Sequence, residues 1–109
     1  MPITFRADRW TGNHWPSIDM MPVDEKYYLP ILHYLSHHYH FPMPPVIDIL
    51  DGYTSDMLIG AICATLHMDT YMFSLGCADE AVRDDVLAVL QSLPASFFDL
   101  PSSRDDEAA

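Results

Sequence analysis

The stretch Thr54-Ser-Asp-Met-Leu-Ile-Gly-Ala-Ile-Cys-Ala-Thr-Leu-His67 occupies the middle of the chain, and its interpretation decides the fold that we expect. Thr54 or Ser55 is a suitable helix N-cap, and Asp56 would follow in the first turn. Four apolar residues recur at the spacing of one helix face: Leu58, Ile59, Ile62 and Leu66. Small residues occupy the other side: Gly60, Ala61 and Ala64. The stretch therefore predicts a central helix that reaches about His67.

Two further helices are expected on either side of this stretch. One runs from about Pro30 to His40 and is ended by the prolines of an extended connector, residues 41–45. The other is amphipathic, runs from Ala78 to Leu93 and stops at Pro94. The short apolar run 46–50 is compatible with either a strand or a helical turn.

Strand signals are fewer. Residues 3–6 and 70–75 alternate between apolar and polar side chains, and we expect them to pair in a small sheet. Residues 8–22 are predicted to be irregular, and Phe97, Phe98 and Leu100 to fold back onto the core. The sequence thus predicts a compact single-domain α+β fold, mostly helical with a two- or three-stranded sheet, over residues 1–101, followed by a disordered tail, 102–109.

The chain is strongly acidic, with a formal net charge of −11 from five basic and sixteen acidic residues. The acidity belongs to the second half, because residues 46–103 contain nine acidic residues and only Arg83 as a base. Such a charge repels nucleic acid and anionic membranes and attracts basic proteins. We therefore expect a basic protein partner, no direct nucleic-acid binding and no membrane binding.

The beginning of the chain lacks the features of a secretory signal, and no apolar run is long enough to cross a membrane. We expect a soluble, cytoplasmic protein in which Cys63 and Cys77 are reduced. Cys77 would lie between a strand and a helix N-terminus, where a thiolate is stabilised. Because Asp79 and Glu80 follow closely and raise a thiol pKa, a structural role for Cys77 is favoured over a catalytic one.

Four of the six histidines fall between His33 and His40. On a helix, His33, His37 and His40 share the arc opposite the apolar residues, and the first two have the i, i+4 spacing of helical zinc ligands. Zinc usually recruits a ligand from a second element, and no His-Glu-x-x-His pattern is present. We expect a solvent-facing or partner-facing stripe and no cofactor, with zinc binding or a pH-dependent charge as alternatives.

Aromatic and acidic residues suggest a contact surface. Trp10 and Trp15 are either lids over the core or anchors for a partner. Acidic residues in the helix 78–93, with others expected beside it (Asp48, Asp51, Asp56 and Asp69), would steer a basic partner and could mimic phosphates. The predicted partner-binding residues are Trp10, Trp15, Tyr53, Asp79, Glu80, Asp84 and Asp85.

These features favour a non-enzymatic acidic binding protein that inhibits or neutralises a basic partner. A nuclease or another nucleic-acid-binding protein would be such a partner, as it is for immunity-type and anti-defence inhibitors. One alternative is a small zinc domain that uses His33, His37 and His40. Another is a structural subunit or homodimer in which the histidine and tyrosine face of the helix is the self-contact.

Overall fold

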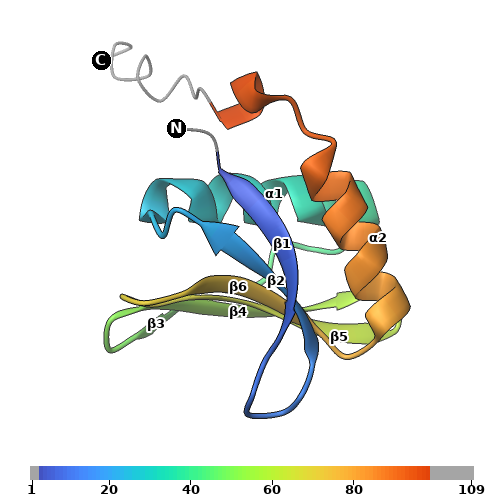
Figure 1. Cartoon of the computed structure of the whole chain (residues 1–109), viewed down its shortest axis with the longest axis horizontal. Helices are drawn as coiled ribbons and strands as arrows, with labels where there is room; N and C mark the ends of the chain where they lie inside the picture. The colour runs from blue at the N-terminus through green and yellow to red at the C-terminus, as the bar shows by residue number, and fades with distance from the viewer. Residues whose placement is uncertain (1–2, 99–109) are drawn as a thin grey trace.

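The computed structural model describes residues 3–98, which form a six-stranded antiparallel sheet with two α-helices (Figure 1). In chain order the elements are β1 (Thr4–Arg9), β2 (Pro16–Met21), the 3-10 turn η1 (Glu25–Tyr27), α1 (Tyr28–Tyr39), β3 (Ile47–Ile49), β4 (Gly52–Ile59), β5 (Ile62–Met68), β6 (Phe73–Cys77), α2 (Glu80–Gln91) and the 3-10 turn η2 (Ala95–Phe98). The strand order is β1-β2-β6-β5-β4-β3. The prediction of a mostly helical domain with two or three strands is therefore wrong, although the α+β class is retained.

The stretch 54–67 is a β-hairpin and not a helix. β4 and β5 pair along almost their whole lengths, from Tyr53 opposite Met68 to Ile59 opposite Ile62. The two-residue loop between them begins with Gly60, whose φ of 65° suits the first central position of a type II′ hairpin turn. The predicted helix fails because burial follows the two-residue period of strands: Met57 and Ile59 are buried on β4, whereas Leu58, assigned to the buried helix face, is 54% exposed.

β1 and β2 form a hairpin of which only β1 was predicted as a strand. β1 pairs with β2, and β2 pairs with β6, so the predicted pairing of residues 3–6 with 70–75 is wrong. The prediction that residues 8–22 are irregular is wrong over β2 and over the last two residues of β1. The predicted strand 70–75 begins later, at Phe73. All five residues of β6 are buried, because the helices cover one face of the strand and Trp10 covers Ser74 and Gly76 on the other. The undecided segment 46–50 contains β3.

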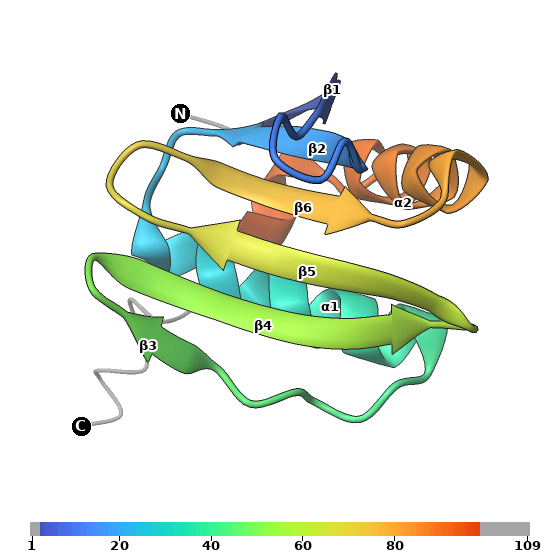
Figure 2. The same ribbon diagram turned by 90° about the horizontal axis from the view of Figure 1, so that it is seen from below.

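Both helices lie on one face of the sheet, as the view from the opposite side shows (Figure 2). The predicted helix 30–40 is confirmed as α1, which buries Tyr28, Ile31, Leu32 and Leu35. The predicted helix 78–93 is confirmed as α2, which packs against β1, β2 and β6. The β3 edge of the sheet is therefore remote from α2 (Figure 2).

Buried polar contacts attach the helices to the sheet. The Tyr28 hydroxyl donates to the carbonyl of Leu66 at 3.1 Å and lies 2.8 Å from the Ser55 hydroxyl, so α1 is bonded to β4 and β5. Burial raises the pKa of Tyr28. Phe98 packs on the core, which confirms that this residue folds back. Leu100 and the predicted tail 102–109 lie outside the described residues.

Candidate binding site

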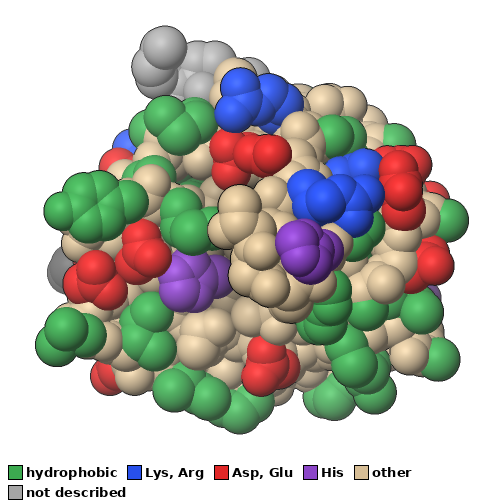
Figure 3. All heavy atoms as spheres, turned by 60° about the horizontal axis from the view of Figure 1, so that its bottom comes forward, with side chains coloured by type: hydrophobic (Ala, Val, Ile, Leu, Met, Phe, Trp, Pro, Cys, Tyr) green, Lys and Arg blue, Asp and Glu red, His purple; other side chains and the backbone are tan. Residues whose placement is uncertain are grey.

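The two tryptophans cover the sheet face that lacks helices. Their rings are stacked, with centroids 6.1 Å apart, and Trp10 donates from its indole nitrogen to the Ser74 hydroxyl at 2.8 Å. Trp10 also lies directly over Gly76, where a Cβ atom would come within 2.6 Å of the ring. Both tryptophans are half-buried: Trp10 is a lid over β6, and Trp15 stacks on Trp10. Acidic side chains are scattered over this face (Figure 3).

The acidic residues predicted on α2 each have a partner within the protein. Asp79 caps the helix by accepting from the backbone nitrogen of Val82, and Asp85 accepts from the Tyr39 hydroxyl at 2.6 Å. Glu80 and Asp84 lie 3.6 and 2.8 Å from the guanidinium of Arg83, and Arg9 also approaches Glu80. The buried Arg83 further donates to the carbonyls of Asp8 and Ser17 and attaches α2 to the β1–β2 hairpin. These acids therefore stabilise the fold, and two arginines offset part of their charge.

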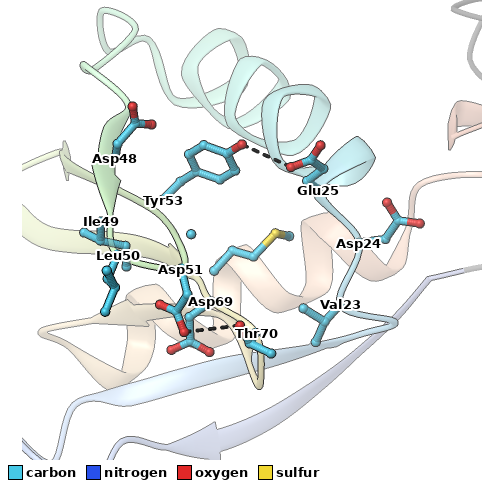
Figure 4. Close-up of a pocket in the computed structure, with 12 residues that line it drawn as sticks. Val23, Asp24, Glu25, Asp48, Ile49, Leu50, Asp51, Tyr53, Asp69 and Thr70 are labelled. Atoms are coloured by element: carbon cyan, nitrogen blue, oxygen red, sulfur yellow. Dashed lines mark hydrogen bonds between the residues drawn. The ribbon is translucent and has the colours of Figure 1, made fainter.

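A denser group of carboxylates surrounds a surface pocket of about 720 Å³ at the β3–β4 end of the molecule (Figure 4). We call this the acidic pocket; its acidic residues are Asp24, Glu25, Asp48, Asp51 and Asp69, and neither Lys nor Arg is among the twelve residues that line it. They come from the segment before α1, from β3 and the turn that follows it, and from the β5–β6 loop. Chain segments distant in sequence thus contribute one sign of charge to one site.

Hydrogen bonds hold several of these carboxylates in place. Tyr53 donates to Glu25 at 3.0 Å, and Thr70 donates to Asp51 at 3.2 Å, as the dashed lines in Figure 4 show. Asp69 accepts from the backbone nitrogens of Tyr71 and Met72. Asp48 is exposed and makes no hydrogen bond or ion pair with another residue of the described range. The pocket therefore presents preorganised carboxylates together with one carboxylate that is free to meet a cation.

Hydrogen bonds shift the pKa values of two groups at the acidic pocket, Asp69 and Tyr53. The hydrogen bond with His67, 2.9 Å away, holds the pKa of Asp69 below its ordinary value. The hydrogen bond with Glu25 raises the pKa of Tyr53, because the carboxylate favours the protonated phenol. Like charges gathered in this way repel one another, and a bound cationic group would relieve that repulsion.

The histidine stripe does not form a three-ligand site. His33 and His37 are exposed on α1, whereas His40 follows the helix in a left-handed conformation, with φ 59°. Over the part of the chain that the structure describes, no group of three or more His, Cys, Asp or Glu side chains is arranged to hold a metal ion. His38 instead contacts the rings of Tyr34 and Tyr39.

The two cysteines are unpaired and lie on opposite faces of the sheet. Cys63 is exposed on the face without helices, and Cys77 is buried beneath the helices. Burial raises the pKa of the Cys77 thiol to about 11, which opposes formation of a nucleophilic thiolate. This placement agrees with the structural role expected for Cys77, although burial raises the pKa of the thiol more than the neighbouring Asp79 does.

Comparisons with known proteins add no family. A scan against protein-family models, a search of curated proteins and a search of solved structures each gave no match. Within residues 3–98, no helix is both long and apolar enough to cross a membrane.

The structure separates the predicted contact residues into three places. Trp10 and Trp15 lie on the open sheet face, the four α2 acids lie beside Arg83, and Tyr53 lines the acidic pocket. Asp48, Asp51, Asp56 and Asp69 were expected beside the helix 78–93. This expectation is wrong, because α2 packs on β1, β2 and β6, whereas these acids lie on β3, on β4 and in the adjoining loops, toward the other edge of the sheet. Asp24 and Glu25 were not among the predicted contact residues. The excess of acids after residue 45 was the available signal, but it did not indicate which acids converge.

Proposed function

We propose that this chain is a non-enzymatic binding protein that neutralises a basic partner by accepting Lys or Arg side chains in the acidic pocket. The observation that carries the proposal is the convergence of five acidic residues, without a lining Lys or Arg, at one pocket. The partner class that fits is a basic nuclease or another nucleic-acid-binding protein, as for immunity-type and anti-defence inhibitors. Association of such charged surfaces is steered electrostatically.

Two features support binding over catalysis at this pocket. Glu25, Asp48 and Asp51 are exposed, and the pKa of Asp69 is lowered, whereas a general acid needs a raised pKa. A carboxylate that stays ionised is suited to holding a cation. The proposal places the protein in the cytoplasm, and the unpaired cysteines on opposite sheet faces support a reducing compartment.

The test compares two variants that each lose two carboxylates. Asp48→Asn with Asp51→Asn removes charge from the acidic pocket, and Asp84→Asn with Asp85→Asn removes the same charge from α2. Both proteins, with the wild type, are used to capture partners from the source organism, and the captured proteins are identified by mass spectrometry. We expect basic proteins that the α2 variant retains and the pocket variant loses.

The purified partner then allows a quantitative measurement. At low ionic strength the pocket variant is expected to associate about tenfold more slowly than the wild type, and the difference should shrink as salt screens the charges. Equal association rates for the two variants would contradict the pocket as the binding site. A partner without a basic surface would contradict the proposed function itself.

A further inference from the structure

The outer edge of β3 lies beside the acidic pocket and pairs with no strand of the described residues. β3 is the last strand in the sheet order, and within residues 3–98 it pairs only with β4. A strand edge presents unpaired backbone N–H and C=O groups, which proteins usually shield with charge, proline or a bulge. β3 is three residues long, carries one charge, Asp48, and follows Pro45, but the other side chains along the edge are apolar and exposed: Val46 is 37% exposed, Ile47 50%, and Leu50 fully exposed.

The two faces of β3 differ in chemistry. Asp48 pairs with Tyr53, so it projects from the face that carries α1 and lines the acidic pocket. Ile47 pairs with Thr54 and Ile49 with Gly52, so both isoleucines project from the opposite face. A strand added beside β3 would therefore have its alternate side chains next to a carboxylate on one face and next to isoleucines on the other.

We propose that the partner contributes an extended segment, with alternating basic and apolar residues, that adds to the sheet beside β3. Its basic side chains enter the acidic pocket from the Asp48 face, and its apolar side chains cover Ile47 and Ile49. Backbone hydrogen bonds to the free edge supply part of the affinity, and the alternation supplies the specificity. This inference rests on the proposed function and adds the mode of recognition.

Charge selects a basic partner over a second copy of this chain. Two β3 strands paired with each other would bring Asp48 and Asp51 of one copy toward the same residues of the other, in a chain of net charge −11. The β1 strand of a second copy, at the opposite edge of its sheet, is also unsuited to be the basic strand that adds beside β3. Its Arg6 is paired with Asp19, and its Arg9 approaches Glu80 and donates to the carbonyl of His14.

The experiment uses four synthetic peptides as probes and the isotopically labelled full chain. The first peptide alternates lysine and valine, and the second has the same composition with its lysines and valines in separate blocks. The third and fourth repeat the first with N-methyl groups on alternate backbone amides. Binding is followed by NMR shifts and by protection of backbone amides from hydrogen exchange. Two N-methyl series, offset by one residue, ensure that one of them blocks the amides that face β3.

We expect the alternating peptide to shift and protect residues 46–50 and to bind at least fivefold more tightly than the block peptide. One N-methyl series should weaken binding by about fivefold for each hydrogen bond removed. Ile47→Lys should abolish binding of the alternating peptide. The matched control Leu58→Lys, which changes an exposed residue of similar exposure on β4, should not.

The outcomes separate the two proposals. Equal affinity for all the peptides, with binding still lost in the variant Asp48→Asn with Asp51→Asn, overturns strand addition and leaves the acidic pocket as a charge-only site. Strand addition is also overturned if no peptide, at millimolar concentration, changes the NMR shifts of residues 46–50. Sedimentation of the protein alone is expected to show a monomer, and a dimer that Ile47→Lys dissociates would assign the edge to a second copy.

Discussion

Replacing Gly60 with alanine distinguishes the hairpin from the helix by the sign of its effect on stability. In a helix interior, alanine is more favourable than glycine by about 0.5–1 kcal/mol, so a helical 54–67 stretch would become more stable. In the structure Gly60 has φ 65°, where an L side chain costs roughly 1–2 kcal/mol. The loss of conformational freedom in the unfolded chain offsets about 0.4–1 kcal/mol of that cost. We expect a net destabilisation of about 1 kcal/mol.

The free energy of unfolding is measured by urea titration. With a slope of about 1–3 kcal/mol per molar urea, a loss of about 1 kcal/mol lowers the midpoint by roughly 0.3–1 M. Gly12→Ala is the matched control, because its φ is not left-handed and a Cβ there meets nothing within 4 Å. Its stability should change by less than about 0.5 kcal/mol. A Gly60→Ala midpoint above that of the wild type would refute the reasoning.

Three further predictions concern the open sheet face, the thiols and the acidic pocket. Gly76→Ala places a Cβ 2.6–2.8 Å from three ring atoms of Trp10, so it should displace the indole and alter tryptophan emission. It should also destabilise the protein by about 1–3 kcal/mol. This loss of stability should be smaller in a Trp10→Ala background, and an equal loss in both backgrounds would be inconsistent with the lid. A thiol-specific reagent at pH 8 should modify Cys63 alone in the native protein, and Cys77 only after unfolding, since Cys77 is buried with a pKa of about 11. In the variant Cys63→Ser, Cys77 is the remaining thiol, and its rapid modification in the native protein would contradict this prediction. Because the folded pKa of Asp69 is lowered, its contribution is fully present above its unfolded pKa, near 4, and is lost as the pH falls through the folded value. The stability advantage of the wild type over Asp69→Asn at pH 5 should therefore shrink between pH 4 and pH 2, and a constant difference would show that the ion pair is not the cause.

Local spacing was enough to predict the two helices. α1 and α2 combine one apolar face with prolines near their ends, and both properties depend on residues a few positions apart. The same calculation placed His33 and His37 on the exposed side of α1, where they lie. Its limit is reached when a short apolar run satisfies two periods at once.

The hairpin 54–67 and the acidic pocket were decided by tertiary structure. Leu58, Ile59 and Ile62 share one face of a helix, but in the structure Leu58 and Ile59 lie on opposite faces of β4. The hairpin also depends on the pairing of β5 with β6, which a pattern confined to residues 54–67 does not include. β6 in turn pairs with β2, which was predicted to be irregular.

The acidic composition belongs to the sequence, but the position of its densest site does not. Asp24, Asp48 and Asp69 are more than twenty residues apart from one another, and they converge because the chain crosses from β2 through α1 to the far edge of the sheet before returning through β4 and β5. The sequence by itself determined the sign of the charge, the helices and the residues available for contact. Only the tertiary structure decided which carboxylates meet, because that depends on strand order, and strand order is set by long-range pairing and burial.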